Sequence, residues 1–125
     1  MDVLISSLWA DGLIRARRSM RSVRILREIE ERIAEPIRIP DLAAAHGLTR
    51  HALYRLFSEE LGTTPTAYIT ARRLSLAVGM LTEGDAPVSA VAAAVGFDDY
   101  SYFIRLFRRE YGMTPLAFRR EQRKK

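Results

Sequence analysis

The sequence predicts an all-α protein with two helix-turn-helix subdomains joined by a long linker helix. Two observations support this: a stretch with helical spacing in the middle of the chain, and a residue pattern that flanks it twice, about fifty positions apart. The offset is 49 for the first two matched positions and 50 for the others, so the second copy has one extra residue in the turn after Gly96. A framework repeated around different polar residues indicates two similar scaffolds that contact two different surfaces. The matched positions are Ala43/Ala92, Gly47/Gly96, Leu53/Phe103, Arg55/Arg105, Phe57/Phe107, Gly62/Gly112, Pro65/Pro115 and Tyr68/Phe118.

Each copy has the layout of a helix-turn-helix. A short apolar helix is followed by Gly47 or Gly96, because glycine adopts the left-handed conformation that ends a helix at little cost. Thr49 or Asp99 then caps a second helix. The early exposed positions of that helix are left free, and in this motif they enter the major groove of DNA. The expected core positions of the second helices are Leu53, Leu56 and Phe57 in the first copy and Phe103, Leu106 and Phe107 in the second.

Residues 1–19 differ in character from the rest, with a short apolar stripe followed by arginines. A stripe of this length does not hold a helix by itself. We expect this N-terminal extension to pack on the domain, on a second subunit as a weak dimer contact, or on a neighbouring domain. A basic amphipathic segment can also lie on a membrane, but its charge fits nucleic acid equally well, and we expect no membrane partner.

The DNA-binding domain is expected over residues 20–125. Its first helix is predicted from about Met20 to Ala34, with Pro36 ending it and Pro40 in the first turn of the next helix. The first helix-turn-helix unit then covers about 39–60 and the second about 87–111. The face expected to be buried in the first helix comprises Met20, Val23, Leu26, Ile29 and Ile33.

The linker helix is predicted over about 65–83, with Tyr68, Leu74, Ala77 and Leu81 on buried faces. A helix over this range is roughly 28 Å long at a rise of about 1.5 Å per residue. Since one turn of B-DNA is roughly 34 Å, such a linker can hold two recognition helices in successive major grooves.

Composition agrees with a polyanionic partner. The formal charge is +5 and the isoelectric point is about 10.1, which favours nucleic acid over acidic or neutral surfaces. Every basic residue except Lys124 and Lys125 is arginine, which suits bidentate contacts to guanine and phosphate, although codon bias explains the same ratio. The absence of cysteine excludes disulfides and thiolate metal sites and favours a cytoplasmic protein. No secretory leader is recognisable.

The doubled pattern resembles the DNA-binding domain of AraC/XylS-type transcription regulators over residues 20 to about 120. The residues that carry the resemblance are Gly62-Thr63-Thr64-Pro65 and Arg73-Leu74-Ser75-Leu76-Ala77, then Val95-Gly96-Phe97-Asp98-Asp99, Phe103-Ile104-Arg105-Leu106-Phe107 and Tyr111-Gly112-Met113-Thr114-Pro115. The resemblance implies seven helices, a monomeric domain that binds asymmetric promoter DNA, and transcriptional control, with activation as the expected direction. Double-stranded DNA is the implied partner, and RNA polymerase is a second candidate.

Carried over residue by residue, the family pattern assigns base contacts and phosphate contacts. The base-contacting positions are His51, Tyr54 and Arg55 in the first unit and Tyr100, Ser101, Ile104 and Arg105 in the second. The phosphate-contacting positions are Arg50, Arg108 and the backbone N–H groups that open the helices near Pro65 and Pro115.

Each assignment has a simpler alternative. The arginines and His51 could be ordinary exposed residues, and Tyr54 could pack sideways against the domain. Ile104 offers only apolar contact, for instance to a thymine methyl. We expect His46 to be a surface residue, while the paired Asp98 and Asp99 beside a polyphosphate are explained only in part, by the capping role of Asp99.

Catalysis is not expected, because the carboxylates and histidines form no metal spacing, no Ser/His/Asp order and no glycine-rich phosphate loop. We expect no cofactor. The main rival is a helical adaptor that binds sigma factor, polymerase or another regulator, although an adaptor has no need of two groove-facing surfaces. Family members usually carry a separate effector-binding or dimerisation domain, so this chain is either a short regulator or the C-terminal piece of a longer one.

Overall fold

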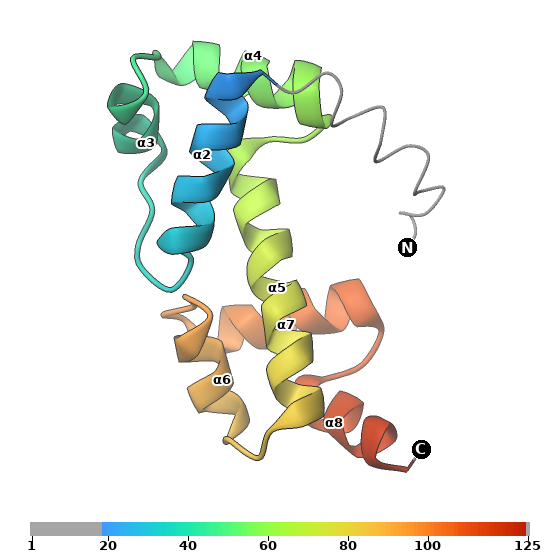
Figure 1. The fold of residues 1–125 in the computed structure, drawn as a ribbon. Coiled ribbons are helices and arrows are strands. Elements are labelled where there is room, and N and C mark those ends of the chain that lie inside the picture. The colour runs from blue at the N-terminus through green and yellow to red at the C-terminus, as the bar shows by residue number, and fades with distance from the viewer. Residues whose placement is uncertain (1–18, 125) are drawn as a thin grey trace. The chain divides into compact units, whose positions relative to one another are not determined.

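The computed structural model describes residues 19–124, and every regular element in this range is a helix (Figure 1). The all-α prediction is confirmed, and residues 19–124 contain the seven helices implied by the family pattern. The expectations for residues 1–18 lie outside the described residues. The helices are α2 (Met20–Glu31), α3 (Ile39–Ala45), α4 (Arg50–Leu61), α5 (Pro65–Glu83), α6 (Val88–Ala94), α7 (Tyr100–Tyr111) and α8 (Pro115–Arg123).

The described chain divides into two compact units. The first unit comprises residues 19–32 and 37–68, and the second unit comprises residues 33–36 and 69–124. Helix α5 therefore begins in the first unit and continues in the second. Residues 33–36, which we call the strap, belong to the second unit although they follow directly on α2.

Helix α2 buries only part of the face predicted for it: Leu26 and Ile29 are buried as expected, whereas Met20 and Val23 are not. Met20 is 68% exposed and Val23 is 36% exposed, while the buried residues are Ser22, Ile25, Leu26 and Ile29. The reason is a polar contact with α4: Glu60 Oε1 accepts hydrogen bonds from Ser19 N and Ser22 Oγ, both at 2.7 Å. These bonds turn the serine side of α2 inward. The helix also ends at Glu31 rather than Ala34.

The first helix-turn-helix has the predicted turn. Helix α3 has Pro40 in its first turn, and the chain reverses at Gly47, whose φ is +70°. Leu48 N then donates to Ala43 O at 2.9 Å. Leu53 and Phe57 of α4 are buried as expected, and α4 packs against both α3 and α2.

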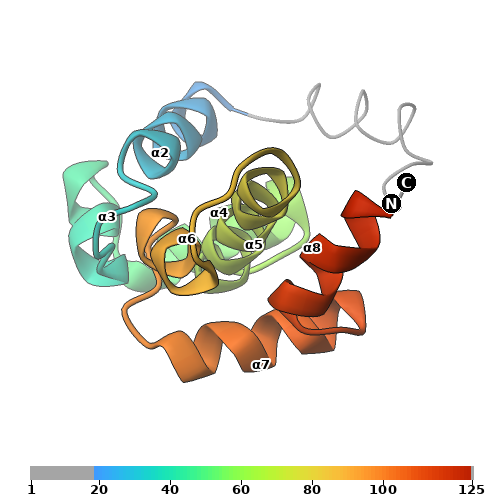
Figure 2. The same ribbon diagram turned by 90° about the horizontal axis from the view of Figure 1, so that it is seen from below.

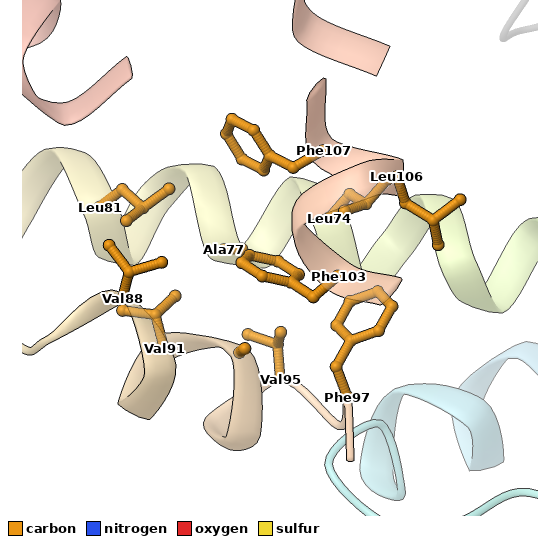
Figure 3. Close-up of a cluster of buried hydrophobic side chains, with 11 residues drawn as sticks. Leu74, Ala77, Leu81, Val88, Val91, Val95, Phe97, Phe103, Leu106 and Phe107 are labelled. Carbon is orange, nitrogen blue, oxygen red and sulfur yellow. The ribbon is translucent and has the colours of Figure 1, made fainter. Parts of the chain in front are cut away.

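The second unit is organised around the later part of α5. Helices α6, α7 and α8 lie on different sides of it (Figure 2). The core combines aliphatic residues of α5 and α6 with three phenylalanines, and burying each such aromatic side chain contributes roughly 1.5–3 kcal/mol. The predicted core positions Leu74, Ala77 and Leu81 are buried, whereas Tyr68 is half-buried. The core, shown in Figure 3, is lined by Leu74, Ala77, Leu81, Val88, Val91, Val95, Phe97, Phe103, Leu106 and Phe107.

The turn of the second unit repeats that of the first with one residue inserted. Phe97 N donates to Ala92 O at 2.9 Å, which matches the bond from Leu48 N to Ala43 O. The caps that follow, Thr49 and Asp99, are 50 positions apart rather than 49. The inserted residue is therefore Asp98, between Phe97 and the cap.

Gly96 lies at the most crowded point of this turn. Its φ is +104°, and a Cβ atom added there would lie 2.4 Å from Ile33 O and 2.6 Å from Arg73 Nε. The same arginine donates from Nε to Ile33 O at 2.9 Å and from Nη2 to Glu35 O at 2.8 Å. Arg73 therefore holds the strap, and the strap lies against the turn.

Two further arginines fix α8 in the second unit. Arg119 is 8% exposed, and its Nε donates to Leu81 O at 3.1 Å. Arg123 Nη2 donates to Gly84 O and to Asp85 Oδ1, both at 2.7 Å. The bond to Leu81 O occupies a carbonyl group in the last turn of α5, which has no partner within the helix, and the bonds to Gly84 and Asp85 hold the loop that follows it.

We predict that three glycine-to-alanine changes have different effects on stability. Gly47→Ala should lower the free energy of unfolding by about 1 kcal/mol, because the positive φ is strained but nothing lies within 4 Å of the new Cβ. Gly96→Ala should lower it by more than about 2 kcal/mol, since the Cβ also collides with backbone. Gly79→Ala, in mid-helix with open space around it, should raise it by about 0.4–1 kcal/mol. Urea unfolding of the three variants measures this order, and equal losses for Gly47→Ala and Gly96→Ala would contradict the crowded turn.

Candidate nucleic-acid interface

Helix α4 presents the three residues predicted to contact bases in the first unit. The predicted cap is confirmed: Thr49 Oγ1 accepts a hydrogen bond from Ala52 N at 3.0 Å. His51 and Arg55 are exposed and lie one turn apart on the same face, whereas Tyr54 is half-buried. The cap therefore fixes the turn from which His51 projects.

The three predicted residues come together at one hollow of the first unit. His51, Tyr54 and Arg55 line an open cavity of about 570 Å³. Its wall carries a guanidinium, an imidazole, hydroxyls and one carboxylate, so it offers hydrogen-bond donors and acceptors to a polar ligand. The remaining lining residues are Ser58, Glu59, Gly62, Thr63 and Thr64.

Sequence reasoning missed these further lining residues for two reasons. Ser58 and Glu59 lie three and four positions after Arg55, so helical spacing would have identified them. Thr63 and Thr64 reach the cavity only because the loop after α4 turns back toward it, and the local sequence carries no signal for this.

Tyr54 connects α4 with the first turn of α5. Hydrogen bonds from the Thr66 hydroxyl and from Arg50 lower the pKa of the Tyr54 phenol. The Arg50 guanidinium lies 5.5 Å from the centre of the Tyr54 ring, within the range of a cation–π contact. Tyr54 is therefore half-buried with its ring beside Arg50, which agrees with the sideways packing considered for it.

Helix α7 presents the candidate residues of the second unit. Asp99 Oδ1 caps it by accepting from Tyr102 N at 3.0 Å. Tyr100, Ser101 and Arg105 are exposed, and Ile104 is half-buried against the core. Arg108, expected at phosphate, is also exposed in the last turn of α7. Tyr102 is not a core residue: the Arg105 guanidinium lies 5.6 Å from the centre of its ring.

Asp98 has a charged neighbour that the sequence did not reveal. Burial lowers the pKa of the Arg73 guanidinium, and the Asp98 carboxylate acts in the opposite direction. Asp98 therefore lies where its negative charge stabilises the charged form of Arg73, the residue that holds the strap.

His46 was expected to be a surface residue, and this expectation is wrong. Its side chain is 14% exposed, and its Nε2 lies 2.9 Å from Glu28 Oε1. The other carboxylate oxygen of Glu28 accepts from Arg32 Nη1 at 3.1 Å. The residue after α3 is therefore tied to α2, and its role is to join two helices of the first unit.

Metal and membrane sites were also considered. Among the described residues, no group of three or more His, Cys, Asp or Glu side chains is arranged to hold a metal ion. None of the helices between residues 19 and 124 has both the length and the apolar character needed to cross a bilayer.

Comparisons with known proteins identify the family. Residues 42–121 match a family model described as a helix-turn-helix domain. The transcriptional activator RhrA of Rhizobium meliloti (strain 1021) is 43% identical over 103 residues, which cover 80% of this chain and 32% of that protein. A crystal structure of an AraC-type regulator from Chromobacterium violaceum matches with a TM-score of 0.74 and 28% identity, covering 82% of this chain and 91% of that chain. The chain belongs to the AraC/XylS family.

A second solved structure of this family is informative because it contains DNA. The DNA-binding domain of AdpA, in complex with a target DNA, matches with a TM-score of 0.81 and 26% identity, covering 85% of this chain and 96% of that chain. The curated relatives are longer: the matches cover 32%, 36% and 35% of RhrA, of LumQ from Photobacterium leiognathi and of NphR from Rhodococcus sp. The chain therefore spans about a third of their length.

The two adjacent aspartates before α7 should differ in their effect on stability. Asp99→Ala removes the side-chain cap of the helix and should lower the free energy of unfolding by about 1 kcal/mol. Asp98→Ala removes only an exposed carboxylate near Arg73 and should lower it by less than about 0.5 kcal/mol. Urea unfolding of both variants measures the difference, and a larger loss for Asp98→Ala would show that the cap is misassigned.

Proposed function

We propose that this chain is a sequence-specific DNA-binding transcription regulator that inserts α4 and α7 into successive major grooves of promoter DNA. The observation that carries the proposal is the pair of capped helices, each with core residues on one face and exposed polar or basic residues on the other. The likeness to a DNA-binding domain solved with its target supports it. The formal charge of +5 supports it as well.

The residues proposed to contact bases all lie on these two exposed faces. In the first unit they are His51 and Arg55, with Tyr54 contributing its ring edge beside the cavity. In the second unit they are Tyr100, Ser101, Ile104 and Arg105. Bidentate hydrogen bonds from arginine to guanine would supply much of the discrimination.

Phosphate contacts are assigned to groups that carry or concentrate positive charge. Arg50 and Arg108 are exposed at opposite ends of their recognition helices. The helices that begin at Pro65 and Pro115 direct the positive ends of their dipoles at these points, which favours anions, although their threonine caps already bind Ala67 N and Ala117 N.

The remaining assignments concern the protein as a whole. We propose that it acts in the cytoplasm without catalytic activity, controls promoters as an activator, and contacts RNA polymerase while bound. Residues 20–125 are assigned to the DNA-binding domain, and residues 1–19 either to a weak dimer contact or to the remnant of a neighbouring domain, so that the protein acts as a monomer or a weak dimer. An adaptor that binds only protein is the alternative, and it should fail to shift any duplex in a gel at low salt.

The salt dependence of binding tests the proposal directly. We expect about 6–8 phosphate contacts and therefore a slope of roughly −5 to −7 in a plot of log affinity against log salt concentration. Titration of a labelled promoter fragment from low to moderate salt measures this slope. A slope near zero would rule out binding through the DNA backbone.

Arg55 and Arg105 should act on separate parts of the binding site, because they lie on different recognition helices. Each change to alanine should cost about 1–3 kcal/mol of binding free energy and relax the preference at a few base pairs. The costs should add within about 0.5 kcal/mol. Selection from a randomised duplex library would reveal two affected groups of adjacent base pairs, about one helical turn apart. We call the group contacted by each unit the box of that unit. Loss of the same box in both variants would contradict the two-groove arrangement.

A further inference from the structure

The two units have the same arrangement of a threonine cap and an aromatic pair next to their recognition helices, and we call this arrangement the frame. Thr64 Oγ1 caps Ala67 N at 3.1 Å, and Thr114 Oγ1 caps Ala117 N at the same distance. The rings of Phe57 and Tyr68 meet edge to face at 6.0 Å and 69°, and those of Phe107 and Phe118 do so at 5.6 Å and 75°. Residues 50 positions apart therefore occupy equivalent places in the two frames.

At three equivalent exposed or half-buried places the two units carry different side chains, polar or charged in the first unit and more apolar in the second. In the first unit they hold Arg50, Tyr54 and Thr66: the guanidinium of Arg50 lies over the Tyr54 ring, and Thr66 and Arg50 lower the pKa of the Tyr54 phenol. The second unit has only Tyr100, Ile104 and Leu116 at these places. We call these three residues the apolar patch.

The apolar patch is open to solvent. Tyr100 is 46% exposed and Leu116 is 47% exposed, while Ile104 packs against the core from its inner side. Ser101 and Arg105 lie beside it on the outer face of α7, and Arg120 follows Leu116 by one turn of α8. A patch bordered by cations suits a partner that is anionic at its edges and apolar at its centre.

Duplex DNA is such a partner, because its backbones are anionic and one of its bases carries an apolar group in the major groove. Thymine carries a C5-methyl group there, and no other base of unmodified DNA does. The patch is continuous with the polar part of the recognition helix, so a methyl group on it would lie next to bases within reach of Ser101 and Arg105. A protein partner would have to cover the same helix face that the proposed DNA contact uses.

We propose that the apolar patch recognises thymine through its methyl group, so that the box of the second unit depends on thymine methyls and the box of the first unit does not. This rests on the proposed function. Leu116 thereby becomes a specificity-determining residue outside the recognition helix. Each buried methyl group should strengthen binding by a factor of about four.

The test uses deoxyuridine, which keeps the hydrogen-bonding groups of thymine and lacks only the methyl. Binding sites are selected from two randomised duplex libraries, one made with thymidine and one with deoxyuridine. Arg55→Ala and Arg105→Ala identify which box belongs to which unit. In the deoxyuridine library, the box of the second unit should no longer favour uracil at the positions where thymine was selected. The box of the first unit should select the same sequence as before, with uracil in place of thymine.

A variant that exchanges residues between equivalent places makes the test specific. Ile104→Tyr with Leu116→Thr gives the second unit the residues that the first unit accommodates in the same frame. Its binding to the selected thymidine duplex should equal its binding to the deoxyuridine form, whereas the parent should differ by about fourfold per methyl. Met80→Thr, at an exposed apolar residue outside the patch, should retain the difference shown by the parent.

The outcomes separate this inference from the proposed function. Two selected boxes with no deoxyuridine effect would overturn the inference and leave DNA binding intact. An undiminished effect in the exchanged variant would overturn it as well, because the methyl would then be read elsewhere. Absence of salt-dependent binding to either library would overturn the proposed function and this inference together.

Discussion

Arg73 donates hydrogen bonds from its guanidinium to the carbonyl oxygens of Ile33 and Glu35, and these two bonds position the strap beside the turn that leads into α7. The strap in turn leaves room only for a glycine at position 96. A lysine could not replace the arginine, because its single ammonium group lacks the planar pair of donors that meets both carbonyls. Asp98, the residue by which the second turn exceeds the first, supports the cation electrostatically. The orientation of α7, and of every candidate contact on it, follows from this arrangement.

Local signals explain why so much of the fold could be predicted from the sequence. The linker helix was expected over 65–83 and is observed over the same residues, because Pro65 opens it and Gly84 follows its end. The caps Thr49 and Asp99 and the positive φ of Gly47 and Gly96 were likewise expected. Each of these features depends on a few adjacent residues, so the sequence around it is sufficient.

The features that were missed depend on residues far apart in the chain. The buried face of α2 is set by Glu60, 38 positions after Ser22, and hydrophobic spacing alone favoured a face that includes Met20. His46 is half-buried and tied to α2 because Glu28, 18 positions earlier in the chain, lies opposite it. In the candidate site, the residues on α4 and α7 were assigned from the family pattern, whereas Thr63 and Thr64, which line the cavity through the path of the loop after α4, were not anticipated. Leu116 reaches the candidate surface only through the packing of α8.

The two recognition surfaces differ in how firmly they are tied to the fold. In the first unit, Tyr54 is held by Thr66 and stacked by Arg50, so a change at this place disturbs a contact between α4 and α5 as well as the surface itself. In the second unit, Leu116 occupies the place of Thr66 and is 47% exposed, so replacing it removes only part of a buried side chain. Exposed positions without structural partners tolerate substitution at small cost to stability. A substitution at Leu116 should therefore disturb the fold less than one at Tyr54, while the threonine caps and aromatic pairs shared by the two units keep α4 and α7 in place.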